Sequence, residues 1–120
     1  MKPIINDCSF GYVNVGDSTI DHDIIIRLSG EIKKRKKKLS KAIYGTSHII
    51  SIDEVKHIYQ KGAELLIIGS GHQGMVKLSN GAAEYLEKRN CRIKKYKTPK
   101  AIIKWNRAKG QVIGLFHLTC

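Results

Sequence analysis

A glycine-rich loop after an apolar run is the stretch of this sequence with the composition of a ligand site. Residues 65–68 are four consecutive apolar residues, and Gly69-Ser70-Gly71-His72-Gln73-Gly74 follows them directly. An apolar run of this length predicts a strand buried on both faces, as in parallel α/β sheets. Ligands of such sheets bind beyond the carboxyl ends of the strands. We therefore expect any site to lie at this loop.

The three glycines of this loop match the G-x-G-x-x-G pattern of dinucleotide-binding proteins. In those proteins the helix begins within the motif, so that its amino end meets the pyrophosphate. Here residues 75–78 intervene before a helix cap at Ser79, and the next predicted strand ends in Lys95-Tyr96-Lys97 instead of an acidic residue. We interpret the loop as a structural turn packed under the next helix, with a turn that exposes amides to an anion as the alternative.

The histidines and cysteines do not form a complete catalytic or metal-binding set. His48 and His72 both follow glycine-bearing loops and could converge, but no i,i+4 pair or C-x-x-C spacing supports a metal site with Cys120. His117 and Cys120, three residues apart, have poor geometry for a base and a thiol nucleophile. We predict no catalytic residue, metal or cofactor, and keep an enzyme using His48 and His72 as an alternative.

The acidic residues have ordinary structural explanations. Asp53 and Glu54 fit the first turn of a helix, where carboxylates are stabilised. Asp21 and Asp23 share one face of a predicted strand, as expected for the solvated face of a hairpin.

Positive charge is concentrated in two regions of a chain with a formal net charge of +12. Residues 31–41 hold seven Lys or Arg against Glu31 alone, and after Glu87 ten Lys or Arg follow with no Asp or Glu. Such a field attracts polyanions or acidic protein surfaces. Because a basic run cannot be buried without partners, we expect residues 33–38 to be an exposed strand end or loop. The predicted basic surface consists of Lys33, Lys34, Arg35, Lys36, Lys37, Lys38, Lys100, Lys104 and Arg107.

The remaining pattern predicts one α/β domain over residues 1–120. Strands over residues 10–15 and 19–26 form a hairpin, and the order from residue 64 is strand, helix, strand, helix, strand. Ser51 and Glu54 form a capping box, and Gly62 is expected to end the helix that they begin. Thr98-Pro99 predicts a helix start with the threonine as cap. Residues 91–97 carry charge on both faces, which places that strand at a sheet edge.

Compartment and redox state follow from what the sequence contains. Cys8, Cys91 and Cys120 are few, odd in number and widely spaced, so reduced thiols are expected. The first residues lack a signal pattern and no run of about 18 apolar residues occurs, so we expect a cytoplasmic protein without a membrane span.

Several phrases taken in order resemble one small α/β family. They are residues 10–12, 21–25, 30–31 leading into 33–38, 39–41, 45–48, 66–74, 84–86, 98–101 and 117–120. The family was first defined structurally on an archaeal hypothetical protein. It includes the adipogenesis-associated protein of animals and the mitochondrial respiratory complex I assembly factor three. The family usually has Gly-Thr-Gly where this chain has Gly69-Ser70-Gly71.

The resemblance implies a three-layer α/β fold with a mixed central sheet and no established enzymatic activity. It also implies that the basic run belongs to the family pattern, and that the mitochondrial member acts as an assembly factor through protein contacts. Our first hypothesis is therefore a non-catalytic interaction domain that docks an acidic protein partner. A candidate anion pocket would be formed by Thr46, Ser47, His48, Gly69, Ser70, Gly71, His72, Gln73 and Gly74. Nucleic-acid binding through the basic run and the Lys100, Lys104 and Arg107 face is the alternative, with nonspecific binding at low salt expected from charge alone.

Overall fold

Strands β7 (Leu65–Ser70) and β10 (Val112–His117) pair in parallel at the centre of a five-stranded sheet in the computed structural model, which describes residues 2–120. Every residue of both strands is buried, as expected for strands covered on both faces. The strand order is β5-β4-β10-β7-β9. The edge strand β9 (Arg92–Tyr96) is parallel to β7, whereas β4 (Ile24–Ile26) is antiparallel to β10 and to β5 (Ile32–Lys34). The predicted mixed central sheet is confirmed, with residues 92–96 at its edge.

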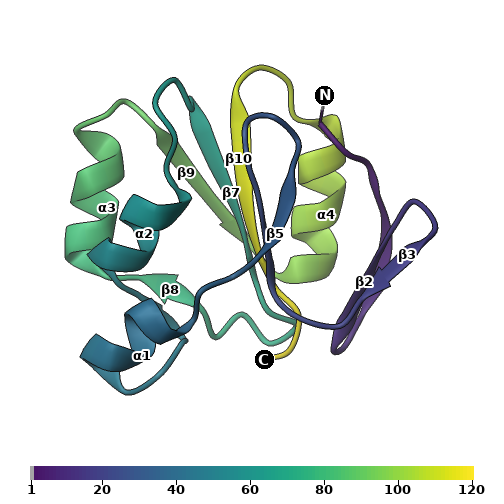
Figure 1. Ribbon diagram of the computed structural model, residues 1–120, viewed down its shortest axis with the longest axis horizontal. Helices are drawn as coiled ribbons and strands as arrows, with labels where there is room; N and C mark the ends of the chain where they lie inside the picture. The colour runs from purple at the N-terminus through teal and green to yellow at the C-terminus, as the bar shows by residue number, and fades with distance from the viewer. Residues whose placement is uncertain (1) are drawn as a thin grey trace.

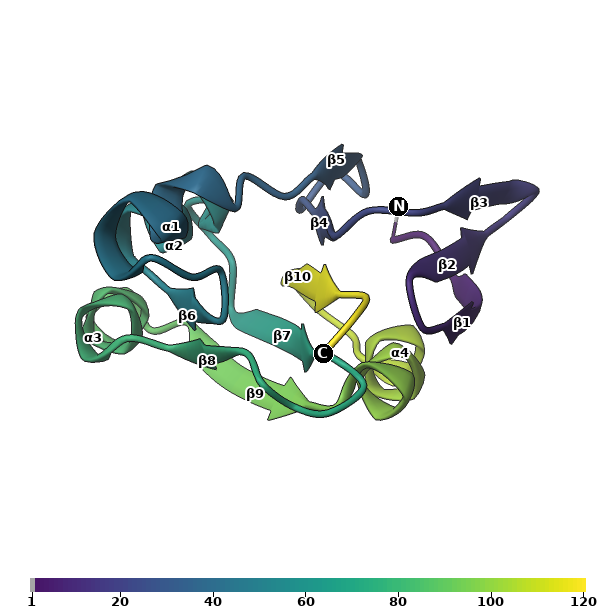
Figure 2. The ribbon, with the colours of Figure 1, turned by 90° about the horizontal axis from the view of Figure 1, so that it is seen from below.

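Helices cover both faces of this sheet (Figures 1 and 2). Helices α2 (Ile52–Ile58) and α3 (Asn80–Glu87) lie on one face, with the short α1 (Lys38–Tyr44) beside α2, and α4 (Thr98–Arg107) lies on the other. The chain passes from β7 through α3 out to β9, then through α4 back across β7 to β10. Because crossovers between parallel strands are right-handed, an outward and a returning crossover place their helices on opposite faces.

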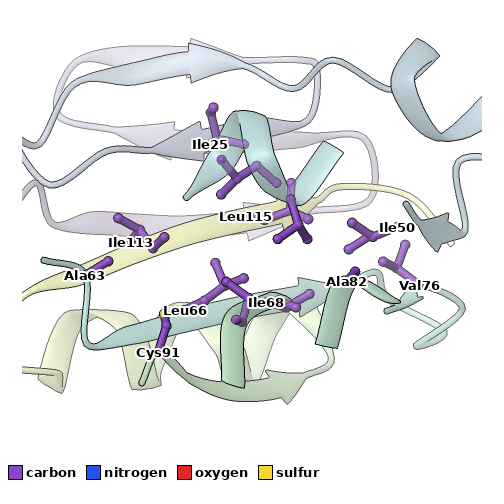
Figure 3. Close-up of a cluster of buried hydrophobic side chains, with 13 residues drawn as sticks. Ile25, Ile50, Ala63, Leu66, Ile68, Val76, Ala82, Cys91, Ile113 and Leu115 are labelled. Atoms are coloured by element: carbon purple, nitrogen blue, oxygen red, sulfur yellow. The ribbon is translucent and has the colours of Figure 1, made fainter. Parts of the chain in front are cut away.

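The alternation of side chains along β7 divides the core in two. Leu66 and Ile68 pack towards α2 and α3 in the cluster that Figure 3 shows. Leu65 and Ile67 face α4, whose fully buried Trp105 belongs to the second cluster. Both faces of the sheet are therefore apolar at its centre.

The N-terminal residues form a separate three-stranded antiparallel sheet of β1 (Ile5–Ser9), β2 (Tyr12–Val15) and β3 (Ser18–Ile20), which lies beside α4. The predicted hairpin is present as β2 and β3, whereas β1 was not predicted. The prediction of a single strand over residues 19–26 is wrong. The extended conformation is interrupted at residues 21–23, where the side chain of Asp23 turns into the interior, and the chain then joins the central sheet as β4.

Helices α2 and α3 begin at the predicted serine caps, whereas the end of α2 differs from expectation. Ser51 caps α2 by accepting a hydrogen bond from the Glu54 amide at 3.1 Å, as predicted, but the Glu54 carboxylate binds Arg35 and does not return to the Ser51 amide. Helix α2 already ends at Ile58, and Gly62 occupies the following turn with φ +97°. Ser79 caps α3, which follows the short parallel pair β6 (Ile49–Ile50) and β8 (Lys77–Leu78).

Candidate functional site

A cavity of about 610 Å³, hereafter the basic cavity, opens beside residues 34–38. Three segments far apart in the sequence form it: residues 21–23 after β3, residues 34–38 between β5 and α1, and residues 118–119 after β10. Gly11, at the turn between β1 and β2, completes the lining. The volume lies within the range of small-molecule and side-chain pockets in proteins.

The lysines of this cavity differ in their partners. Lys34, Lys36 and Lys38 are exposed, and none of them has a carboxylate within 4.0 Å among residues 2–120. Lys37 is half-buried, with its Nζ 3.5 Å from Asp23 Oδ2. These three ammonium groups outnumber the one exposed carboxylate of the lining, Asp21, which gives the concavity a positive potential.

The prediction that the whole basic run is exposed is wrong at Arg35. Its side chain is buried and forms two hydrogen bonds with Glu54, Nε to Oε2 at 2.6 Å and Nη2 to Oε1 at 3.1 Å. Its Nη1 also donates to Asp23 Oδ2 at 3.0 Å, and its Nη2 to the carbonyl oxygen of Ser47 at 2.7 Å. Arg35 is thus part of the wall of the cavity and of the interior, and its predicted place on the exposed basic surface is wrong.

Glu54 is held by further partners on the helix side. The hydroxyl of Ser40 donates to Glu54 Oε1, and the same hydroxyl oxygen accepts from the Ser51 amide at 2.9 Å. Ser40, Ser51 and Glu54 are all fully buried. The ion pair therefore ties the basic run to α1 and to the start of α2.

Asp23 is the second acidic centre of this buried network. Its carboxylate accepts from His117 Nδ1 at 2.6 Å, from the Leu118 amide at 2.8 Å and from Arg35 at 3.0 Å. Burial alone would raise the pKa of Asp23, but the hydrogen bond and charge of His117, the Leu118 amide and Lys37 together lower the pKa to about 2. Asp23 is therefore ionised at neutral pH and only accepts hydrogen bonds.

The connection from Asp23 through His117 reaches a hydroxyl in the cavity. Thr119 Oγ1 lies 3.2 Å from His117 Nε2, so the three side chains have the connectivity of an acid–base–hydroxyl triad. His117 is only 1% exposed, and Asp23 already pairs with Arg35 and Lys37. An imidazolium formed here would share one carboxylate with two other cations, so we assign the connection a structural role.

The glycine loop is packed against the end of the chain segment that follows β10. The amides of Gly71, His72 and Gln73 donate to Thr98 Oγ1, to the carbonyl of Thr119 and to the main-chain oxygen of Cys120, at 2.9, 2.7 and 3.0 Å. The Gly74 amide also donates within the chain, to the Gly71 carbonyl at 3.3 Å. These amides therefore donate to acceptors within the protein, and the basic cavity is lined by other residues.

The rest of the predicted pocket contributes structural contacts. Ser70 Oγ donates to the Tyr96 carbonyl at 3.0 Å, and a Cβ on Gly69 would touch Phe116 and Thr98 at 3.0 Å. Thr46 Oγ1 accepts from the His48 amide at 3.1 Å.

The two predicted loops meet across His117. The ring of His48 lies edge-on to the ring of His117 at 5.5 Å, and a Cβ on Gly71 would come within 2.8 Å of His117 Cδ2. His72 instead packs on Phe10, with ring centroids 5.7 Å apart. Its Nε2 has no hydrogen-bond partner among residues 2–120. The two histidines therefore pack against different rings.

Thr98 has a role that sequence reasoning missed. It is the first residue of α4 and its side chain does not cap the helix. Its hydroxyl accepts from the Gly71 amide and donates to the His117 carbonyl at 2.6 Å, which joins the ends of β7, α4 and β10. The burial of Arg35 could have been predicted from the sequence. Arg35 is the one arginine among five lysines, and arginine suits buried bidentate ion pairs.

A second concavity of about 250 Å³, hereafter the β9–α4 groove, contains two of the other predicted basic residues. Lys104 and Arg107 line it, and the Lys100 ammonium lies 5.6 Å from the centre of the Tyr96 ring beside it. Lys33, on β5, is exposed.

The sequence matches a protein-family model, and the fold matches several solved structures. A family model described as "Protein of unknown function (DUF498/DUF598)" matches residues 5–116. The chain is similar to a conserved hypothetical protein, PH1505, of Pyrococcus horikoshii OT3, at 30% identity over 100% of both chains with a TM-score of 0.90. It is also similar to the protein MT938, at 27% identity over 99% of this chain and 100% of that one, with a TM-score of 0.83. A Bordetella parapertussis protein shares the fold, with a TM-score of 0.74 at 15% identity over 98% and 96% of the two chains.

Within residues 2–120, no helix has the length and apolar character needed to cross a membrane. The same residues contain no group of three or more His, Cys, Asp or Glu side chains arranged to hold a metal ion.

Proposed function

The chain belongs to the DUF498/DUF598 family, whose description assigns no function, and we propose that it is a non-catalytic interaction domain that binds an acidic segment of a partner protein. The binding site of this proposal is the basic cavity. The observation that carries it is the gathering of the exposed Lys34, Lys36 and Lys38 around one cavity of about 610 Å³.

The size and shape of the cavity fit a short segment. Its volume is large enough for a few side chains, whereas a folded partner would contact only its rim. Carboxylates on such a segment would pair with the three free ammonium groups. Thr119 Oγ1 and the ring of His22, both in the lining, add hydrogen-bonding groups for main-chain or side-chain oxygens.

The buried network supports this role by holding the lysines in place. Arg35 sits between Lys34 and Lys36 and is bonded to Glu54, to Asp23 and to the Ser47 carbonyl. Its neighbours therefore project from a fixed backbone, and less conformational entropy is lost when a partner binds.

The same network argues against chemistry at the cavity. Every strong donor near Asp23 already points at its carboxylate, and His117 is out of contact with solvent. A general base must reach the proton that it abstracts and hold the resulting charge. His117, which is buried between two loops, can neither reach a substrate proton nor hold the resulting charge.

The experiment compares two triple charge reversals in binding to a labelled glutamate-rich peptide, followed by fluorescence anisotropy at low and physiological salt. The first variant is Lys34→Glu/Lys36→Glu/Lys38→Glu. The second, Lys61→Glu/Lys77→Glu/Lys88→Glu, makes the same change in net charge at exposed lysines outside both concavities. We expect the first to lose at least about tenfold in affinity and the second less than about threefold, because nearby charges outweigh screened ones. Equal losses of affinity in the two variants would show that the peptide responds only to net charge, and would overturn the proposal.

A further inference from the structure

We propose that the β9–α4 groove binds single-stranded nucleic acid, a second activity at a site separate from the basic cavity. The walls of the groove carry five cations: Arg92, Lys94, Lys104, Arg107 and Lys109. Its floor is formed by Leu65, Ile67 and Ala108, with Leu65 only 7% and Ile67 only 2% exposed, and the half-buried Tyr96 completes the lining. No acidic side chain of residues 2–120 lines it.

The topology explains why this groove is open. Residues 92, 94 and 96 point to the α4 face of the sheet because side chains alternate along a strand. Helix α4 packs mainly on β7, so the same face of the edge strand β9 is left beside the helix and not beneath it. The result is a channel with a strand on one side, a helix on the other and the buried face of β7 at its base.

The cations of this region are not paired with carboxylates of the fold. From Lys88 onward the chain holds ten Lys or Arg and no Asp or Glu. None of these ten has a carboxylate within 4.0 Å among residues 2–120, in contrast to Arg35 and Lys37. Cations grouped without counter-charges repel one another, so a bound polyanion would relieve that repulsion.

The combination of an apolar floor, an aromatic ring and cationic walls indicates which polyanion would bind in the groove. Single strands bind proteins by placing bases on apolar and aromatic surfaces while cations follow the phosphates. Arg92 and Arg107 supply planar guanidinium groups suited to phosphate oxygens. Lys100 and Lys104 hold their ammonium groups 5.6 and 5.7 Å from the centre of the Tyr96 ring, which places positive charge beside the aromatic surface.

Two other polyanions match the groove less well. A duplex presents no unstacked bases to the Tyr96 ring, and a concavity of about 250 Å³ is too small to admit it. An acidic peptide offers charges for the walls, but aspartate and glutamate side chains have no ring to stack on Tyr96. We therefore expect a single strand to bind more tightly than either.

The test uses the full chain and a fluorescein-labelled oligothymidylate, with anisotropy measured at low and at physiological salt. The groove variant is Lys94→Glu/Arg107→Glu, and the matched control is Lys61→Glu/Lys88→Glu, which changes net charge equally. All four residues are exposed, and a urea unfolding curve verifies that each variant is folded. We expect binding at physiological salt, a loss of at least about tenfold in the groove variant, and less than about threefold in the control.

The proposal would be overturned by a wild-type protein that releases the oligonucleotide at physiological salt, or by equal losses in the two variants. A polyglutamate competitor as effective as unlabelled oligothymidylate would overturn it too. A duplex that competes equally well would also contradict it, because the Tyr96 ring would then have no role. Binding of the glutamate-rich peptide at the basic cavity is measured with other residues, so either proposal can fail while the other stands.

Discussion

Arg35 is joined to Glu54 by two parallel hydrogen bonds, and both side chains are buried. The pair connects the middle of the basic run to the first turn of α2. Arg35 also reaches Asp23, so one guanidinium links two carboxylates from different parts of the chain. The lysines on either side of Arg35 therefore project from a fixed point of the fold.

Removing this guanidinium should destabilise the protein strongly. Arg35→Met is expected to lower the free energy of unfolding by about 3–5 kcal/mol, because Glu54 and Asp23 would remain buried without their cation. Lys36→Met, at the exposed neighbouring position, should change it by no more than about 0.5 kcal/mol. Urea unfolding measures both, and similar effects of the two variants would contradict the role assigned to Arg35.

Acid should weaken the fold through Asp23. Its folded-state pKa of about 2 is below the ordinary value of 3.8, so its contribution is present above the ordinary value and is lost as pH falls towards 2. We expect the stability difference between the wild type and Asp23→Asn to shrink by about 2 kcal/mol between about pH 5 and pH 2. Urea unfolding at several pH values measures it. A difference that stays constant with pH would show that Asp23 is not held ionised.

Two glycines with nearly the same φ angle distinguish the cost of backbone strain from the cost of a steric clash at an added Cβ. Gly71 has φ +98° and Gly62 has φ +97°, but an added Cβ would lie 2.2 Å from the Cys120 carbonyl carbon at Gly71 and would meet nothing within 4 Å at Gly62. Gly62→Ala should cost about 1–2 kcal/mol from the backbone alone. Gly71→Ala should cost about 1–3 kcal/mol more, because the packing must shift. Equal changes in urea midpoint would contradict the close packing of the glycine loop.

The Thr98 hydroxyl should matter through its two hydrogen bonds and not as a helix cap. Thr98→Val is expected to cost about 1–3 kcal/mol, since the buried Gly71 amide and His117 carbonyl would lose their partner. Thr98→Ser keeps the hydroxyl and should cost less. Hydrogen exchange at the Gly71 amide distinguishes the variants, because only the valine should accelerate it. Unchanged exchange in Thr98→Val would show that another group holds this amide.

The sequence was a good guide to elements whose signal is local. The apolar run of β7, the Ser51 cap and the charged edge strand β9 were each predictable from adjacent residues. Strand β1 was missed because residues 5–9 are mostly exposed and lack a regular alternation of apolar residues.

The site was less predictable because its contacts span long separations in sequence. Asp23 meets His117 across 94 residues, and Arg35 meets Glu54 across 19. The single arginine is the one local sign of which residue of the basic run turns inward, and it does not identify the partners of that residue. No local pattern indicates that the glycine loop would be filled by the segment after β10. The basic residues themselves were identified, but their division into a cavity and a groove depends on the tertiary fold.

The location of the acidic peptide on the surface tests the central claim most directly. Backbone amide chemical shifts of the full protein, followed by NMR while an unlabelled glutamate-rich peptide is added at physiological salt, would give that location. We predict changes concentrated at residues 34–38, His22 and Thr119, with saturation as the cavity fills. Changes spread over all exposed lysines, or centred on residues 92–109, would contradict the assignment of the basic cavity as the partner site.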